Sequence, residues 1–251
     1  MTSEEEGYIT LFCEGDGHVR ITDSGYPKIV FAQKEREVLD YIDSLTKNGH
    51  VYSNGPNAWS LEFHGSHCIP LLEIFSRHAV GKHFLDRLNE VLAFMNMPLA
   101  VQHPLTLEGF AAFWGAEGSS SNMPKITVSQ GDREILDLIV EMFGGSISRY
   151  KELSGKWQYQ WELYGEEARK LYKTLLGESH CPAKAEELRK NFEGPSYYEL
   201  NKDKAKAYYG THKAEYKVRS EKCNTERKAI QEWVKAHPEE VAKMLAEKAI
   251  G

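Results

Sequence analysis

Two acidic residues, Asp16 and Glu117, occupy matching places in the sequence and could bind metal ions. Each closes an apolar run and precedes a glycine, in LFCEGDG (11–17) and FAAFWGAEG (110–118). Apolar runs of this kind indicate buried helices, and a carboxylate at the C-terminal end of a helix is disfavoured because the helix dipole is negative there. Such a position becomes favourable when a cation binds, and carboxylate oxygens are ligands for divalent metal ions.

The chain repeats the surroundings of these acids. Asp16 and Glu117 lie 101 positions apart. Three further matches follow in the same order. KIVFAQKEREVLDYI, which starts at residue 28, matches KITVSQGDREILDLI, which starts at 125, with an offset of 97. WSLEFHG at 59 matches YQWELYG at 159 with an offset of 100, and GKHFLDRL at 81 matches AKAEELRK at 183 with an offset of 102. Landmarks that stay in register indicate a duplicated module of about 100 residues.

Each module predicts the order helix–strand–strand–helix–strand–strand–helix–helix. Strands are expected where polar and apolar residues alternate, and helices where apolar residues recur every three or four positions. The first helices are expected at 7–14 and 105–114. We expect an α+β protein with an N-terminal repeat at 1–98, a linker at 99–104 and a C-terminal repeat at 105–192. A helical extension is expected at 193–251, and its last amphipathic helix should start near Pro238.

Composition narrows the class of protein. The chain has 251 residues, a net charge of −6 and 41% hydrophobic residues, which suits a globular protein with a real core. No stretch approaches the ~20 apolar residues of a membrane span, and the acidic N-terminus lacks the basic region of a secretory signal. We therefore expect no membrane partner and a cytoplasmic protein, with a nucleoid or an organelle matrix as alternatives. A negative total charge argues only weakly against nucleic-acid binding, because the local field decides it.

The two strings ITLFCEGDG (9–17) and FAAFWGAEG (110–118), each followed by the same strand–strand–helix pattern, resemble those of single-chain, two-repeat LAGLIDADG homing endonucleases. The resemblance covers about residues 7–192. It implies that the two signature helices pack side by side about a pseudo-twofold axis and that each half contributes a twisted four-stranded antiparallel sheet. Together the sheets would form a saddle in the DNA major groove. The chain departs from the family pattern at Gly115, where an acid is common, and at Leu11, where a small residue is usual.

The resemblance also implies the chemistry of the two acids. Asp16 and Glu117 would hold Mg²⁺, as two or three divalent ions, together with the backbone oxygens of Gly15 and Ala116. Two metal ions beside a phosphodiester can activate water and stabilise the leaving oxygen. Because two nearby acids repel each other, the site would be unfavourable without such cations. The alternative is that each acid is an ordinary solvated group at a helix end.

Four supporting residues stand at paired positions. Gln33 and Gln130 end the second strands, and the resemblance makes them organisers of active-site water; the alternative is that they cap the strand ends. Lys82 and Lys184 occupy positions at which the family often carries a basic residue near the scissile phosphate. A lysine beside that phosphate would stabilise the negative charge that develops during cleavage. The alternative is an ordinary lysine on a helix surface.

Alternation along the strands selects the side chains that would read DNA, because successive strand residues point to opposite faces. Counting from Asp16, the outward set in the first half is His18, Arg20, Thr22, Ser24, Lys28, Val30, Tyr52, Asn54 and Ser60. The second half offers Ser119, Ser121, Lys125, Thr127, Ser148, Tyr150, Gln158 and Gln160. A register error of one residue would turn each set to the other face.

These features predict a monomeric, intron-encoded homing endonuclease, part of a mobile genetic element. It would make a metal-dependent double-strand break in a long, pseudo-palindromic DNA target. One alternative is a maturase that binds intron RNA, and another is a DNA-binding regulator that does not cut; both could lose the acids. The lysines and tyrosines of the extension, such as Lys213 and Tyr216, either contact flanking phosphates or lie on a solvated helix.

Overall fold

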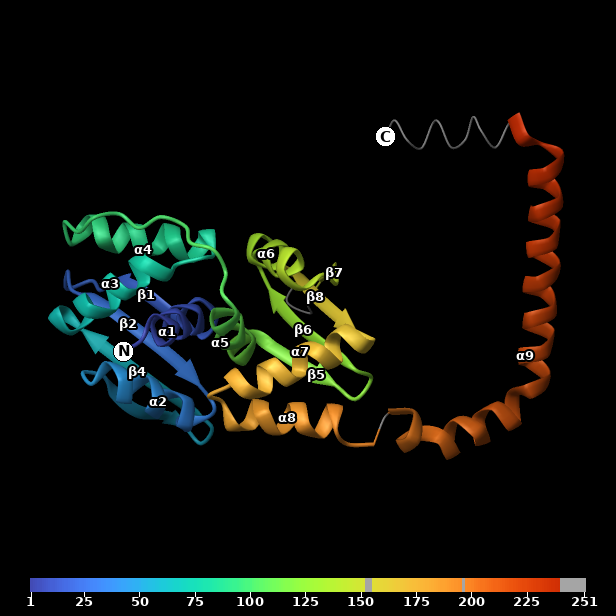
Figure 1. The fold of residues 1–251 in the computed structure, drawn as a ribbon, viewed down its shortest axis with the longest axis horizontal. Coiled ribbons are helices and arrows are strands. Elements are labelled where there is room, and N and C mark those ends of the chain that lie inside the picture. Colours follow the sequence, from blue (N-terminus) through green and yellow to red (C-terminus); the bar gives the residue numbers. More distant parts are fainter. Residues whose placement is uncertain (152–154, 196, 240–251) are drawn as a thin grey trace. The chain divides into compact units, whose positions relative to one another are not determined.

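The computed structural model describes residues 1–151, 155–195 and 197–239. The chain divides into two compact units, Met1–Ser196 and Tyr197–Gly251. The first unit contains both repeats (Figure 1), and the second contains one long helix, α9 (Tyr197–Ala236). None of the helices in the described part of the chain has the length and apolar character to cross a bilayer.

The two repeats have the element order that the sequence predicts, so the expected α+β fold is confirmed. The first repeat comprises α1 (Ser3–Asp16), β1 (Gly17–Ile21), β2 (Pro27–Gln33), α2 (Arg36–Thr46), β3 (His50–Gly55), β4 (Ala58–His64), the short 3-10 helix η1 (Gly65–Cys68), α3 (Ile69–His78) and α4 (Lys82–Phe94). The second comprises α5 (Leu107–Glu117), β5 (Gly118–Ser121), β6 (Lys125–Gln130), α6 (Glu134–Phe143), β7 (Ser146–Lys151), β8 (Trp157–Tyr164), α7 (Gly165–Glu178) and α8 (Pro182–Phe192).

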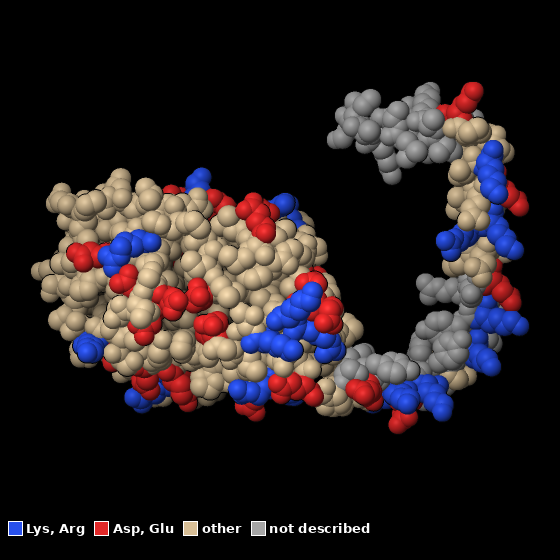
Figure 2. All heavy atoms as spheres, viewed as in Figure 1, with Lys and Arg blue, Asp and Glu red and all other residues tan. Residues whose placement is uncertain are grey.

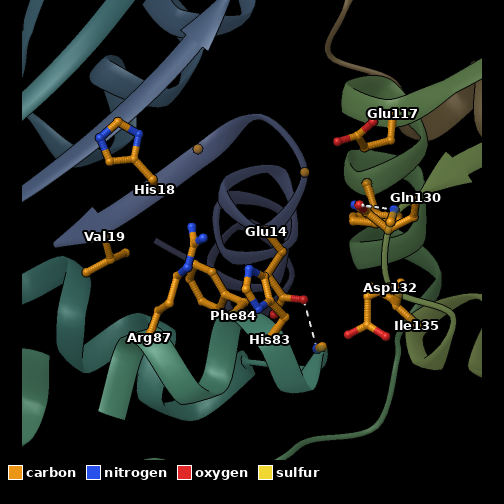
Figure 3. Close-up of a pocket in the computed structure, with 15 residues that line it drawn as sticks. Glu14, His18, Val19, His83, Phe84, Arg87, Glu117, Gln130, Asp132 and Ile135 are labelled. Atoms are coloured by element: carbon orange, nitrogen blue, oxygen red, sulfur yellow. Dashed lines mark hydrogen bonds between the residues drawn. The ribbon is translucent and has the colours of Figure 1, made fainter. Parts of the chain in front are cut away.

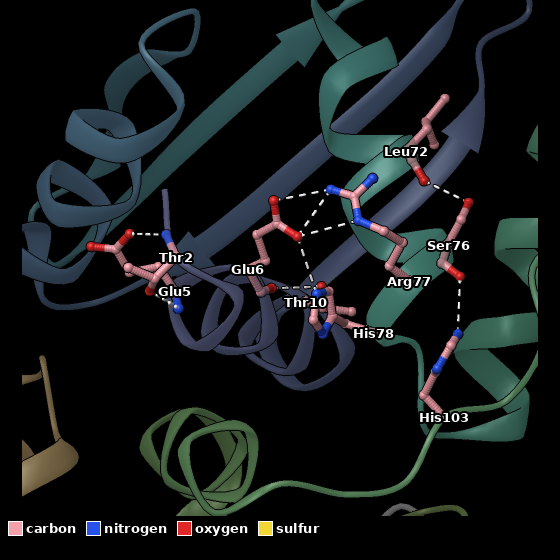
Figure 4. A network of polar contacts seen from close by, with 9 residues as sticks. All are labelled: Thr2, Glu5, Glu6, Thr10, Leu72, Ser76, Arg77, His78 and His103. Carbon is pink, nitrogen blue, oxygen red and sulfur yellow. Dashed lines mark hydrogen bonds and ion pairs between the residues drawn. The ribbon is translucent and has the colours of Figure 1, made fainter.

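The two signature helices are longer at the end that carries the acid than the sequence predicts. Helix α1 continues to Asp16, and α5 continues to Glu117. At its other end α1 begins early because Thr2 caps it: the Thr2 hydroxyl accepts from the Glu5 N–H, and the Glu5 carboxylate accepts from the Thr2 N–H (Figure 4). Thr106 caps α5 with its hydroxyl alone, which accepts from the Gly109 N–H at 3.1 Å.

Each repeat forms one four-stranded antiparallel sheet. The strand order is β1-β2-β4-β3 in the first and β5-β6-β8-β7 in the second, so the two sheets share one topology. Their registers also match, since His18 pairs with Val30 in one sheet and Ser119 pairs with Thr127 in the other. The duplication seen in the sequence therefore extends to individual residue positions.

Helices α1 and α5 pack against each other at the centre of the first unit (Figure 1). The middle of each helix, residues 7–13 of α1 and 109–115 of α5, is buried on all sides, which explains why these stretches show no polar stripe. A Cβ atom built on Gly109 would lie 3.1 Å from the Leu11 Cγ atom. The large Leu11 side chain is thus accommodated because its neighbour across the interface is a glycine.

A polar network ties the start of α1 to the end of α3. The Arg77 guanidinium donates to both carboxylate oxygens of Glu6, and His78 Nε2 lies 3.1 Å from Glu6 Oε2 (Figure 4). Burial raises the pKa of Glu6, but the hydrogen bonds and charges of Arg77 and His78 outweigh burial and hold that pKa below its ordinary value. The network fixes the orientation of α1, whose far end carries Asp16.

Helix α9 forms the extension expected after residue 192. Lysine and arginine side chains are interspersed with aspartate and glutamate along it (Figure 2). This mixture is typical of a solvated helix face. The final helix expected near Pro238 lies largely outside the described residues.

Candidate active site

Helices α1 and α5 lie in close contact immediately before their two acids. A Cβ atom built on Gly15 would lie 2.5 Å from the Ala116 Cβ atom and 3.2 Å from the Glu117 Cγ atom. Only a glycine at position 15 allows this approach. Asp16 and Glu117 are therefore brought together at one end of the helix pair, as the sequence predicts for one site.

Asp16 is held by the strand that follows it. Gln33, the last residue of β2, donates from Nε2 to Asp16 Oδ2 at 2.6 Å. Burial raises the pKa of Asp16 to about 6, against the smaller lowering effects of the Gln33 hydrogen bond and the Lys184 charge. This acid therefore keeps a proton at higher pH than a solvated aspartate does.

Glu117 occupies the equivalent position in the second repeat and has an equivalent partner. The Gln130 side chain, at the end of β6, forms a hydrogen bond with it. Burial, and next the negative charge of Asp16, raise the pKa of Glu117 to about 7. Each acid thus has a glutamine partner from the strand end where sequence matching places one.

Of the two lysines expected at the site, Lys184 reaches it. Its ammonium group donates to the Gly118 carbonyl oxygen, lies 5.6 Å from the centre of the Trp114 indole ring, and lowers the pKa values of both Asp16 and Glu117. Lys82 is exposed on the first turn of α4. Among the described residues, no hydrogen bond or ion pair joins Lys82 to either acid.

A different residue of the first repeat contacts the start of α4. The Glu14 carboxylate accepts the N–H groups of Val80 and Gly81 at 2.7 and 2.8 Å. Burial raises the pKa of Glu14 to about 8, although these two hydrogen bonds lower it. Glu14 thus satisfies free N–H groups at a helix N-terminus. The matched position in the second repeat is Gly115, and no acid is needed there.

A pocket of about 510 Å³ opens beside Glu117. Figure 3 shows Glu14, His83 and Arg87 on its first-repeat side, and Glu117 and Asp132 across from them. Neither His83 nor Arg87 stands out in the repeat pattern of the sequence. They lie one and five residues after Lys82 on the same helix, so a basic residue does line this side of the site.

Solved structures with similar folds were found, although no protein-family model and no curated protein matches the sequence. The LAGLIDADG meganuclease I-AabMI, bound to uncleaved DNA, aligns over 75% of this chain and 89% of its own with a TM-score of 0.58 and 16% identity. This chain has the LAGLIDADG fold. The meganuclease I-SmaMI bound to uncleaveable DNA aligns over 76% and 99% with a TM-score of 0.53 and 11% identity. The I-SmaMI homing endonuclease bound to cleaved DNA aligns over 86% and 94%, with a TM-score of 0.52 and 12% identity.

The donor set at Asp16 and Glu117 fits divalent cations. Asp16 and Glu117 supply two carboxylates whose pKa values are raised by burial and, for Glu117, by the neighbouring charge, so a cation would relieve the unfavourable energy of both. No cluster of three or more His, Cys, Asp or Glu side chains suited to a metal occurs in the described part of the chain. Mg²⁺ needs no such cluster, since it is commonly bound by one or two carboxylates together with waters and substrate phosphates.

The sheets of this LAGLIDADG fold present the polar side chains that alternation predicts. Residues such as Ile29 and Phe31 on β2 point into the core, and the residues between them point to the opposite face. We call this the outer face. It carries His18, Arg20, Lys28, Val30, Tyr52, Asn54 and Ser60 in the first sheet, and Ser119, Ser121, Lys125, Thr127, Ser148, Tyr150, Gln158 and Gln160 in the second.

Some outer-face residues are covered by their neighbours. Val30, Ser60 and Thr127 are buried, and the Ser60 hydroxyl accepts from the Asn54 amide. Thr22 and Ser24 follow β1, in the turn that leads to β2. Alternation thus identifies the face that a residue belongs to, whereas longer neighbouring side chains decide whether it can be reached.

Sequence reasoning missed two acids on the outer face, Glu62 on β4 and Glu162 on β8. Each is paired with a lysine of the neighbouring strand, Lys28 or Lys125. The alternation that selects Ser60 also selects Glu62, two positions further on. The signal was therefore present in the sequence.

Proposed function

We propose that the protein is a site-specific DNA endonuclease that makes a double-strand break with the help of divalent metal ions held at Asp16 and Glu117. One observation carries the proposal: two acids from equivalent helices meet at one place, and their pKa values are raised to about 6 and about 7. Perturbed carboxylates at the meeting point of two equivalent subdomains are expected where charged substrate and cations bind.

The duplication suits a substrate with two similar halves. Each repeat supplies one acid, one glutamine and one polar sheet face, so each repeat can serve one strand and one half-site of duplex DNA. The solved structures with this fold include endonucleases bound to DNA, which supports DNA as the substrate. The outer faces differ in many residues, which favours a long target that is only partly palindromic.

The residues of the site have separable roles in this proposal. Metal ions at Asp16 and Glu117, with the backbone oxygens of Gly15 and Ala116, would supply an activated water and charge stabilisation at the phosphate. Gln33 orients the Asp16 carboxylate through its 2.6 Å hydrogen bond, and Gln130 holds Glu117.

Lys184 is the cation of the second repeat that acts on both acids. Its charge favours their ionised forms, which are the forms that bind metal. Its contact with the Gly118 carbonyl holds it next to Glu117, where a phosphate would also be attracted. Lys82 is free to contact DNA phosphates from the surface of α4, while Arg87 lines the pocket beside the acids.

The biological setting follows from the activity. Both acids lie on one chain, so a monomer is sufficient to cut both strands. The protein would act in a compartment that contains DNA, as the product of an intron or another mobile element. The alternatives that the sequence leaves open, an RNA maturase and a regulator that does not cut, need no pair of partly buried acids, and both acids are present here.

Cleavage of a randomised duplex library tests the proposal. The protein is incubated with the library and Mg²⁺, and cut ends are sequenced. A discrete cut site on both strands supports the endonuclease. Sequence-specific binding without cutting would contradict it and favour the regulator, and binding to structured intron RNA alone would favour the maturase.

A further inference from the structure

Each outer face carries a lysine–glutamate pair. Lys28 Nζ lies 2.6 Å from Glu62 Oε2 in the first sheet, and Lys125 Nζ lies 2.5 Å from Glu162 Oε1 in the second. The exposed fractions of the side chains are 16% and 13% in the first pair and 22% and 17% in the second. Both pairs are thus held in fixed positions on the sheet, with part of each charged group facing outward.

Neighbouring side chains hold both carboxylates in the ionised form. His64 Nε2 lies 2.9 Å from Glu62 Oε2, and the Tyr164 hydroxyl donates to Glu162 Oε2 at 2.7 Å. Burial raises the pKa of each glutamate, but the hydrogen bonds from lysine and from these neighbours outweigh burial and lower it. At neutral pH each pair therefore presents a fixed donor beside a fixed acceptor.

The two pairs occupy equivalent positions. Glu62 pairs across the sheet with Val30, and Glu162 pairs with Thr127, which is the matching residue. Each lysine stands two positions before that residue on the same strand. Elsewhere the matched outer-face residues differ, as His18 and Ser119, Arg20 and Ser121, Ser60 and Gln160, and Tyr52 and Ser148 do. The lysine and the glutamate are the same in both sheets while their surroundings are not.

We infer that the Lys28–Glu62 and Lys125–Glu162 pairs each read one G·C base pair, at symmetric positions in the two halves of the DNA target. The inference rests on the proposed function, because it requires the outer faces to lie in the major groove. Lysine is a donor to the O6 and N7 atoms of guanine, and glutamate accepts from the N4 amino group of cytosine. The two partners of a G·C pair are thus recognised by the two members of one ion pair.

The same chemistry disfavours an A·T pair in this orientation. With the lysine on adenine, the glutamate would face the O4 acceptor of thymine, and two acceptors repel each other. A T·A pair lacks the guanine N7 acceptor beside the lysine and brings the adenine N7 acceptor to the side of the glutamate. A simple phosphate contact is a poorer explanation, because a lysine neutralised by a fixed carboxylate contributes little net charge to backbone binding. Where the two faces carry different residues, the halves of the target should differ in sequence.

A binding selection from a randomised duplex library, with the full chain and Ca²⁺ in place of Mg²⁺ to slow cutting, tests the inference. We expect a preference of about tenfold or more for G·C at two positions equally far from the centre of the site. Glu62→Gln should reduce the preference in one half only, and Glu162→Gln in the other half only. Glu73→Gln, an exposed acid on α3, is the matched control and should change neither.

A charge swap separates base reading from a merely structural ion pair. The double variant Lys28→Glu with Glu62→Lys keeps an ion pair in the sheet but exchanges donor and acceptor, so the preference in that half should invert from G·C to C·G. An unchanged preference in this folded variant would overturn the inference. A discrete target without G·C at the two symmetric positions would also overturn it and leave the proposed function standing. No discrete target for the unaltered protein would overturn both.

Discussion

Asp16 and Glu117 end two neighbouring helices, and the charge of Asp16 adds to burial in raising the pKa of Glu117 to about 7. The two carboxylates therefore act on each other in the folded protein. In the unfolded chain they lie 101 positions apart in sequence and have no such interaction. Folding thus creates an unfavourable pair of negative charges, which is a cost that a functional site can explain.

This relationship predicts how stability depends on pH. An acid whose pKa is raised by folding binds its proton more tightly in the folded state, so the stability that it contributes is greatest at low pH and is lost as pH rises. For Asp16 and Glu117 the window runs from about pH 4, near the ordinary pKa values of Asp and Glu, to about pH 7, the higher of the two pKa values in the folded protein. Urea unfolding at pH 5 and pH 8 measures the difference.

The double variant Asp16→Asn with Glu117→Gln should flatten this pH dependence. One pKa unit corresponds to about 1.4 kcal/mol, and partial solvent access reduces the effect, so we expect a gain of about 1–2 kcal/mol at pH 8 and a smaller gain at pH 5. A variant that is less stable than the unaltered protein at pH 8 would contradict the assignment of a strained acid pair.

The glycine between the helices gives a second prediction. Gly15→Ala would place a Cβ atom 2.5 Å from that of Ala116, so we expect a loss of about 1–3 kcal/mol in the free energy of unfolding. Gly115→Ala is the matched control, because a Cβ atom there has no neighbour within 4 Å and alanine favours a helix by up to about 1 kcal/mol. Equal effects of the two substitutions would show that the helices are not packed as described.

Glu14 should be a structural residue, distinct from the acid two positions later. Above pH 8, where Glu14 is ionised, Glu14→Gln puts an amide NH₂ group in place of one acceptor, which leaves the N–H of Val80 or Gly81 without a partner. We expect a destabilisation of about 1–3 kcal/mol by thermal and urea unfolding. Glu73→Gln, exposed on α3, should stay within about 0.5 kcal/mol of the unaltered protein. No loss of stability in Glu14→Gln would refute this role.

The two matched lysines should differ in their effect on cleavage. Lys184→Met removes the cation that lowers the pKa values of both acids, so we expect single-turnover cleavage to fall by at least about tenfold, an effect that corresponds to about 1.4 kcal/mol. Lys82→Met should change cleavage by less than about threefold and weaken DNA binding slightly, because its side chain is exposed. A larger loss of cleavage for Lys82→Met would reverse this assignment.

The contrast between these lysines shows where sequence reasoning stops. GK at 81–82 and AK at 183–184 occupy the same place in the duplicated pattern, and both lysines lie in the first turns of their helices. Lys184 lies over the indole ring of Trp114, whereas the residue of the first repeat that matches Trp114 is Cys13. The difference therefore depends on a partner 70 positions away in the chain, which local spacing does not reveal.

The fold itself was predictable for a physical reason. Hydrophobic periodicity and the offset near 100 predict the order of the helices and strands in both repeats, apart from the short η1, because the same elements must pack in the same way twice. The absence of an acid at Gly115 becomes understandable once the structure shows that Glu14 binds the N–H groups of Val80 and Gly81. The residues that match Val80 and Gly81 are Pro182 and Ala183, and proline has no N–H group for an acid to accept.

The most direct test of the account is cleavage of the selected duplex target by Asp16→Asn and by Glu117→Gln, with binding measured in parallel. If both acids hold the metal ions, each substitution should lower the cleavage rate by at least about a hundredfold, because metal stabilisation of the reacting phosphate is worth several kcal/mol. Binding affinity should stay within about threefold, since neither acid lies on an outer face. Undiminished cleavage by either variant would contradict the two-acid site.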